Sequence, residues 1–277
     1  MGRVIDSTPH VVVESKSHDG KHSLSFDKTT HIYRLNGVRV PGATTIGSVY
    51  PKGEGLIRWM IEQGMKEYEE KSALERGGGV GTFLHTYAEL FETGRMEQFD
   101  WRAVDSSPYQ ADIRAVIARF NLWRATNCDT VLMMEATCGS TTLAAAGCID
   151  TLRRREIGGV QRLVLHDYKT SKSIYVTHLI QVVGGYRRMM REWYGLDIPY
   201  VEITKFPKQA DVNMETLLCD ADGWQKTEYI DGVPYTATRV EVPGLFAALE
   251  AQFERNYGTY RFQKDIENKL SPPYKKK

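Results

Sequence analysis

The sequence has little cysteine and no stretch typical of a membrane or secreted protein. No apolar run approaches the roughly 20 residues of a membrane-spanning helix, and the polar first ten residues lack the layout of a signal peptide. The four cysteines form no CxxC pair, which favours buried thiols in a reducing compartment over a zinc or iron–sulfur site; they are Cys128, Cys138, Cys148 and Cys219. We therefore expect a cytoplasmic protein without an iron–sulfur cluster.

Neither sign of charge is in excess. The 277 residues carry 36 Lys and Arg against 35 Asp and Glu, a net charge of +1. The chain thus lacks the broad basic field of a protein that coats nucleic acid, and contacts with a polyanion must come from local patches. Hydrophobic residues at 42% and charged residues at 26% are ordinary for a globular chain and exclude a largely disordered or fibrous protein.

The order of the predicted elements favours an α+β (α/β) fold. Asn36-Gly37 lies between two β-prone runs, which predicts a two-residue hairpin over 31–40. Apolar periodicity predicts helices over 52–71, from about 82 after a break at glycines 77–79, and over 108–126, 175–194 and 243–257; strands are predicted over 130–137, 143–153, 162–168 and 200–206. We expect one domain over 1–270, with a central mixed β-sheet flanked by helices, and a basic tail at 271–277.

A second predicted hairpin sets two carboxylates side by side. If Gly158-Gly159 is its turn, residue i faces residue 317 − i, so Asp150 lies opposite Asp167. Because side chains alternate along a strand, Lys169 joins both aspartates on one face. Such a pair of like charges persists when a divalent cation bridges it or when one member is protonated. On spacing alone, an ordinary solvated ion pair is an equal alternative.

The motifs GCID and HDYKT resemble the core of the PD-(D/E)XK nuclease superfamily, specifically its RecB-like exonuclease branch. Gly147 and Asp150 correspond to its G-x-x-D element, and Asp167 and Lys169 to its D-x-K element. Further matches follow the order of that branch; they are G-x-x-x-H ending at His85, a glutamate at Glu135 and a helical glutamine at Gln181. The segment HIYRLNGVRVPGATTI is similar to the opening of phage-type members and of mitochondrial genome maintenance exonuclease relatives.

The resemblance implies a metal site and roles for its residues. His85, Asp150 and Asp167, with the carbonyl of Tyr168, would hold Mg²⁺ or Mn²⁺. Lys169 would be the catalytic lysine, and Gln181 would position it or the attacking water. Glu89 and Glu135 would be outer or alternative contacts to the metal.

One spacing departs from the pattern of the family. Its helical tyrosine follows the glutamine by four residues, whereas Tyr186 follows Gln181 by five. At about 100° per residue, this spacing rotates Tyr186 by about 140°, unless a π-bulge at Gly184-Gly185 restores its place. The resemblance is therefore carried over to Gln181, and the role of Tyr186 stays open.

The function implied by the resemblance is hydrolysis of DNA. We expect a restriction-endonuclease-like nuclease core over about 127–206, preceded by the hairpin and a helical insertion over about 31–126. The expected activity is that of a Mg²⁺- or Mn²⁺-dependent DNA exonuclease, in phage recombination or replication. Alternatives are a structure-specific or nicking endonuclease and a non-catalytic DNA-binding or assembly protein that retains the fold.

Arginine clusters are the predicted contacts to DNA. Because phosphate contacts position a protein without reading sequence, such patches suit an end-dependent nuclease of low sequence specificity. They lie near the tip of the second hairpin and on the helix after it, at Arg153, Arg154, Arg155, Arg162, Arg187 and Arg188. A solvated charged face is the simpler interpretation of each cluster. A homo-oligomer or a recombination or replication partner completes the expected partners.

Overall fold

A large mixed β-sheet lies at the centre of the protein. The structure, a computed structural model, describes residues 11–49, 67–127 and 129–270. The sheet has the strand order β11-β10-β9-β8-β7-β6-β5, and β12 pairs with β10. Its strands are β5 (Thr130–Ser140), β6 (Ala145–Ile157), β7 (Val160–Lys169), β8 (Tyr200–Lys205), β9 (Met214–Asp220), β10 (Gly223–Ile230), β11 (Val233–Thr236) and β12 (Val240–Glu241). β7 and β8 run parallel, and their other neighbours in the sheet are antiparallel to them.

A second, antiparallel sheet is formed by the N-terminal strands. It contains β1 (Val12–Lys16), β2 (Ser23–Asp27), β3 (Ile32–Leu35) and β4 (Val38–Val40). The predicted hairpin is confirmed, because Leu35 pairs with Val38 across Asn36-Gly37. Both turn residues have positive φ, 49° and 79°, as a two-residue turn of this handedness requires.

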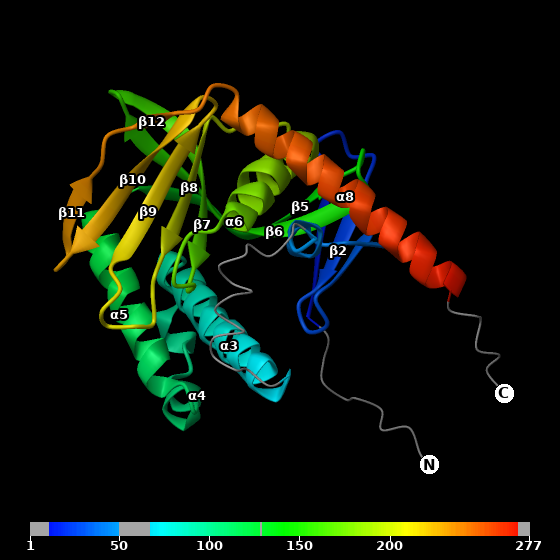
Figure 1. The fold of residues 1–277 in the computed structure, drawn as a ribbon. Helices are drawn as coiled ribbons and strands as arrows, with labels where there is room; N and C mark the ends of the chain where they lie inside the picture. The colour runs from blue at the N-terminus through cyan, green and yellow to red at the C-terminus, as the bar shows by residue number, and fades with distance from the viewer. Residues whose placement is uncertain (1–10, 50–66, 128, 271–277) are drawn as a thin grey trace, which may run out of the picture.

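Helices cover both faces of the central sheet (Figure 1). One layer contains α3 (Glu67–Glu92), α4 (Trp101–Ser106) and α5 (Gln110–Thr126), with the short turn η1 (Met96–Gln98) between them. The other contains α1 (Ala43–Gly47), α6 (Val176–Leu179), η2 (Ile180–Tyr186), α7 (Arg187–Tyr194) and α8 (Leu245–Leu270). The predicted α+β fold with a central mixed sheet flanked by helices is confirmed. None of the described helices is long and apolar enough to cross a membrane.

Helix α3 differs from the prediction at its glycines. The break expected at glycines 77–79 is absent, and α3 runs through them to Glu92. Glycine disfavours a helix by about 1 kcal/mol each, but Val80, Leu84 and Ala88 on the same helix are completely buried in the core. Burial of this face outweighs the local penalty. Most of the helix predicted over 52–71 lies outside the described residues.

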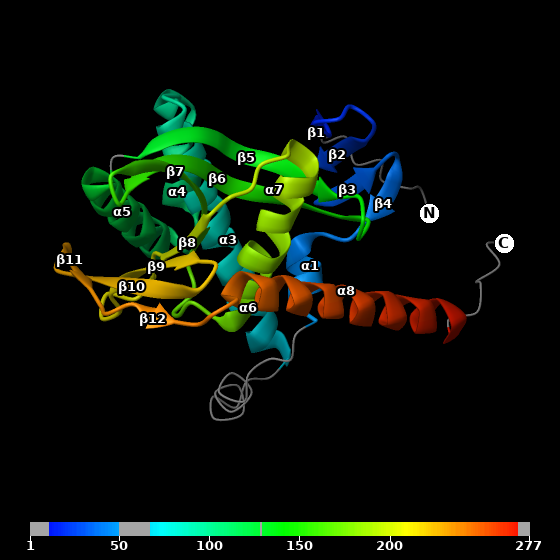
Figure 2. The ribbon, with the colours of Figure 1, turned by 90° about the horizontal axis from the view of Figure 1, so that it is seen from above.

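The helix predicted over 175–194 is wider than an α-helix in its middle part, the π-helix η2. Its residues follow a π-helical path, and α6 and α7 continue it on either side. Glycines make room here for α8, since a Cβ on Gly184 would lie 2.3 Å from the Leu249 carbonyl oxygen. A Cβ on Gly185 would lie 2.7 Å from the Phe253 ring. The first half of α8 therefore approaches the turn as closely as glycine permits, while its second half projects from the body of the protein (Figure 2).

We predict that Gly184→Ala lowers the free energy of unfolding by about 2 kcal/mol, because the added methyl group meets backbone atoms that cannot move aside cheaply. Chemical denaturation measures the change. Gly258→Ala is the matched control, since Gly258 lies in α8 with open space around it. This control should stabilise the protein by up to about 1 kcal/mol. Equal effects of the two substitutions would contradict the close approach of α8.

Candidate metal centre

The register of β6 and β7 is the one expected from the sequence. Pairs from Ile157 with Val160 to Thr151 with His166 obey the predicted relation. One step further, Asp150 comes beside Asp167, and there the side chain of Asp150 enters the hydrogen-bonding pattern. Its Oδ2 accepts a hydrogen bond of 2.6 Å from the backbone N–H of Tyr168. The Asp150 carboxylate is thus fixed to the strand that carries Asp167 and Lys169.

Glu135 brings a third carboxylate from the next strand. On β5 its neighbours Met134 and Ala136 pair with Thr151 and Ile149, so Glu135 stands opposite Asp150. Its φ of 44° lies in the left-handed region, which costs a residue with a Cβ about 1 kcal/mol or more. A carboxylate from each of the adjacent strands β5, β6 and β7 therefore gathers at one place.

His85 approaches this row from α3. Its Nδ1 lies 3.3 Å from Asp150 Oδ1 and 3.5 Å from Glu135 Oε1. One ligand atom from each of these three residues lies within 4.8 Å of the others. A single ion could therefore contact all three. One imidazole nitrogen with carboxylate oxygens suits Mn²⁺ and, less well, Mg²⁺.

The cluster has a strong preference for positive charge. Burial opposes protonation of His85, yet the carboxylates of Asp150 and Glu135 raise its pKa to about 10. Burial alone would raise the pKa of Asp150, but the charge of His85 holds it below its ordinary value. An imidazolium thus satisfies the carboxylates, at the position where the donor atoms would hold a metal ion.

Asp167 and Lys169 form the other half of the site. Lys169 Nζ lies 2.5 Å from Asp167 Oδ2, and the Asp167 side chain is 2% exposed. Burial raises the pKa of Asp167 to about 6, although Lys169 acts in the opposite direction. Asp167 Oδ1 is buried without a hydrogen-bond partner in the described part of the chain. Such an oxygen fits a cation, so the residues present suit a divalent metal.

The π-helical turn brings Gln181 and Tyr186 together. Gln181 Nε2 donates hydrogen bonds to Tyr186 Oη at 2.9 Å and to Thr44 Oγ1 at 3.1 Å. Gly147 of the GCID motif makes room for Tyr186, because a Cβ there would lie 2.4 Å from the tyrosine ring. The π-helix η2 thus accommodates the five-residue spacing from Gln181 to Tyr186, which had left the role of Tyr186 open. The double glycine in a helical segment was the available signal.

Two of the predicted residues, Glu89 and Arg153, have partners outside the cluster. Glu89 interacts with Arg95 at 3.2 Å and with Lys28 at 4.0 Å, so its predicted contact to the metal is not supported. The prediction that Arg153 binds DNA is wrong, because its side chain is 0% exposed and points into the layer of α3 and α5.

The other arginines predicted to bind DNA form two groups, those with carboxylate partners and those that are exposed. Arg155 is bound by Asp129 and Glu202, Arg187 by Asp197 and Glu250, and Arg188 by Glu192 and Glu254. Their guanidinium groups already have carboxylate partners, which opposes the predicted role in phosphate binding. Arg154 and Arg162 are exposed near the hairpin tip, and for them the role stays a prediction. Arg162 is five residues from Asp167, about 16 Å along β7.

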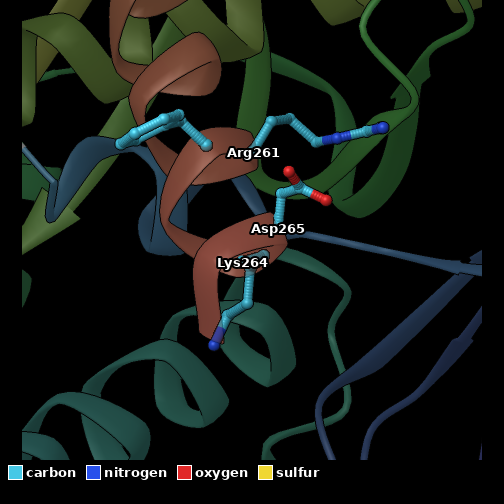
Figure 3. A pocket seen from close by; sticks show the side chains of 4 residues that line it. Arg261, Lys264 and Asp265 are labelled. Carbon is cyan, nitrogen blue, oxygen red and sulfur yellow. The ribbon is translucent and has the colours of Figure 1, made fainter. Parts of the chain in front are cut away.

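Two hollows are present on the surface of the described residues. One is lined by Arg261, Phe262, Lys264 and Asp265 of α8, as Figure 3 shows. A second lies over β1, β2 and β3, between Glu14 and Gly37. Neither includes a residue of the cluster, so the candidate site is defined by its charged groups and not by these hollows.

Comparisons with known proteins give a distant likeness to a solved structure. No protein-family model matches the sequence, and no curated protein matches it. The crystal structure of an alkaline exonuclease, LHK-Exo from Laribacter hongkongensis, is similar over 84% of this chain and 95% of that chain, with 13% identity and a TM-score of 0.33.

We predict that Mn²⁺ binding near pH 8 releases about one proton, which His85 must lose before its Nδ1 can bind a metal. The pKa of His85 is about 10 and that of Asp167 about 6, so between pH 7.5 and 8.5 only the imidazolium gives up its proton. The affinity should therefore rise about tenfold per pH unit in this window. Calorimetry in buffers of different ionisation enthalpy counts the protons. His85→Asn should release none, and a pH-independent affinity of the unaltered protein would contradict the assignment.

Proposed function

We propose that this protein is a metal-dependent deoxyribonuclease of the PD-(D/E)XK type. The observation that carries the proposal is the convergence of three carboxylates, a histidine and a lysine from β5, β6, β7 and α3. His85, Glu135, Asp150 and Asp167 would hold Mg²⁺ or Mn²⁺, with the Tyr168 carbonyl as a further ligand. When bound, the ion would lower the pKa of a water and stabilise negative charge on the scissile phosphate.

The protein's own groups divide the remaining work. Lys169, held by Asp167, is 19% exposed and carries a proton, because the two aspartates raise its pKa against the effect of burial. It can therefore donate a hydrogen bond to the attacking water or to a phosphate oxygen. Gln181, fixed by Thr44 and Tyr186, would orient Lys169 or that water.

His178 supports the charge of the site in a different way. Burial and the nearby charge of Lys169 lower the pKa of His178 to about 3. Its ring is therefore neutral at physiological pH. A neutral imidazole near Lys169 adds no positive charge to that of the lysine.

The expected reaction is in-line hydrolysis of a phosphodiester bond. It leaves a 5′-phosphate and releases the 3′-oxygen. Action from DNA ends, in phage recombination or replication, is proposed from the ordered motifs His85, Asp150, Asp167 to Lys169 and Gln181. A nicking or structure-specific endonuclease would use the same chemistry and differs in whether a free end is required.

We predict that Lys169→Ala lowers the rate of DNA hydrolysis at least 100-fold, because a pre-organised cation at the reacting phosphate is removed. End-labelled linear DNA with Mg²⁺, Mn²⁺ or EDTA provides the assay. Lys172→Ala is the matched control, since Lys172 is an exposed lysine three residues further along the chain and should leave the rate unchanged.

Closed circular DNA separates the two modes of action. An exonuclease leaves it intact, whereas an endonuclease cuts it. Absence of metal-dependent hydrolysis by the unaltered protein would overturn the enzymatic proposal. Full activity of Lys169→Ala would remove the role given to this lysine.

A further inference from the structure

A buried ion-pair network lies on the reverse face of the strands that carry the candidate metal ligands. Arg153 is three residues from Asp150 on β6, and Tyr168 stands between Asp167 and Lys169 on β7. Because side chains alternate along a strand, both lie on the face opposite Asp150 and Asp167, toward α3 and α5. There the Tyr168 ring also contacts the ring of His85, with 6.2 Å between their centres. Arg153 Nη2 donates one hydrogen bond to Tyr168 Oη and another, of 2.8 Å, to Glu92 Oε1.

Glu92 connects this network to α3. It follows His85 by seven residues, two helical turns, so the two side chains leave the same face of the helix. His85 contacts Asp150 and Glu135, whereas Glu92 contacts Arg153 and Arg124 Nε, the latter also at 2.8 Å. The helix is therefore fixed to the sheet at two points about 10 Å apart.

The contacts of Arg153 leave it little freedom. Its side chain is fully buried, and its guanidinium lies 5.1 Å from the centre of the Trp123 ring and 5.9 Å from that of Tyr168. An unpaired charge at such a place would be strongly disfavoured, so Arg153 keeps Glu92 and Tyr168 in place. Through Tyr168 it also acts on the backbone N–H that binds Asp150.

We propose that Arg153 is a positioning residue for the metal centre and holds α3, β6 and β7 in the arrangement that brings the ligands together. The inference rests on the proposed function, because it concerns the same centre. Arg153 touches neither the ligand atoms nor the substrate side of the sheet. Its effect reaches the centre through Glu92 and His85 on α3, and through Tyr168 on β7.

The test is the affinity for Mn²⁺, measured by calorimetry without DNA. We expect Arg153→Met to weaken binding about tenfold, the lower end of the effect of groups that orient metal ligands. Tyr168→Phe removes the hydroxyl that accepts a hydrogen bond from Arg153, and it should also weaken the binding of Mn²⁺. It serves as the second variant if Arg153→Met does not fold.

Arg155→Met is the matched control. Arg155 lies two residues further along β6, on the same face, and its carboxylate partners are Asp129 and Glu202, neither of which holds α3. The control should lower stability while leaving the affinity for Mn²⁺ within about twofold. Equal weakening by Arg153→Met and Arg155→Met would overturn the proposal, because any loss of buried charge would then suffice.

Hydrogen exchange provides a readout that needs no metal. Arg153→Met should speed exchange of the Tyr168 amide and of amides near Glu92, and Arg155→Met should not. Unchanged exchange, or faster exchange with an unaltered affinity for Mn²⁺, would overturn the positioning role. If the unaltered protein does not bind Mn²⁺, this role is overturned with the centre. Weakened binding in Arg153→Met with no hydrolysis by the unaltered protein would uphold the inference and refute the nuclease.

Discussion

The repulsion between three carboxylates on adjacent strands is the constraint on which the rest of the structure depends. Pairing of β5, β6 and β7 sets Glu135, Asp150 and Asp167 next to one another, and like charges so placed disfavour the sheet. Positive charge must therefore be supplied from outside the row. His85 comes from α3 and Lys169 from the end of β7, and each lies against a carboxylate. The charges of His85 and Lys169 offset this repulsion, and a divalent cation held by the same carboxylates would offset it as well.

The helical layer on the other side of the site depends on close backbone contacts. Gln181 reaches Tyr186 because η2 is wider than an α-helix, and α8 packs against the glycines of that turn. Gly147 on β6 then admits the tyrosine ring. Thus a strand glycine, a helical double glycine and a helix more than 60 residues further along the chain determine together where one glutamine amide lies.

Sequence predicted those features that short-range chemistry controls. The turns at Asn36-Gly37 and Gly158-Gly159 set the register of their hairpins, so the proximity of Asp150 and Asp167 followed from counting residues. The strands over 214–241 were not predicted, because their mixed polar composition obscures the alternation of buried and exposed residues in these half-buried antiparallel strands. The left-handed conformation of Glu135 and the continuity of α3 depend on tertiary packing. Side chains alternate between the two faces of β6, so Arg153 points inward and Arg154 outward. This alternation was the signal in the sequence that the predicted DNA contacts did not take into account.

The buried charges behind the sheet also limit how its strands can align. Apolar side chains of similar size often stabilise a core as well as buried ion pairs do, so stability alone does not explain Arg153 and Arg155. Each arginine has carboxylate partners on a different element, Glu92 on α3 and Glu202 on β8. A slip of β6 by one residue would direct both arginines to the opposite face and break their ion pairs with Glu92 and Glu202. The same slip would remove Asp150 from Asp167. We therefore infer that the register which satisfies the reverse face is the one that assembles the carboxylate row.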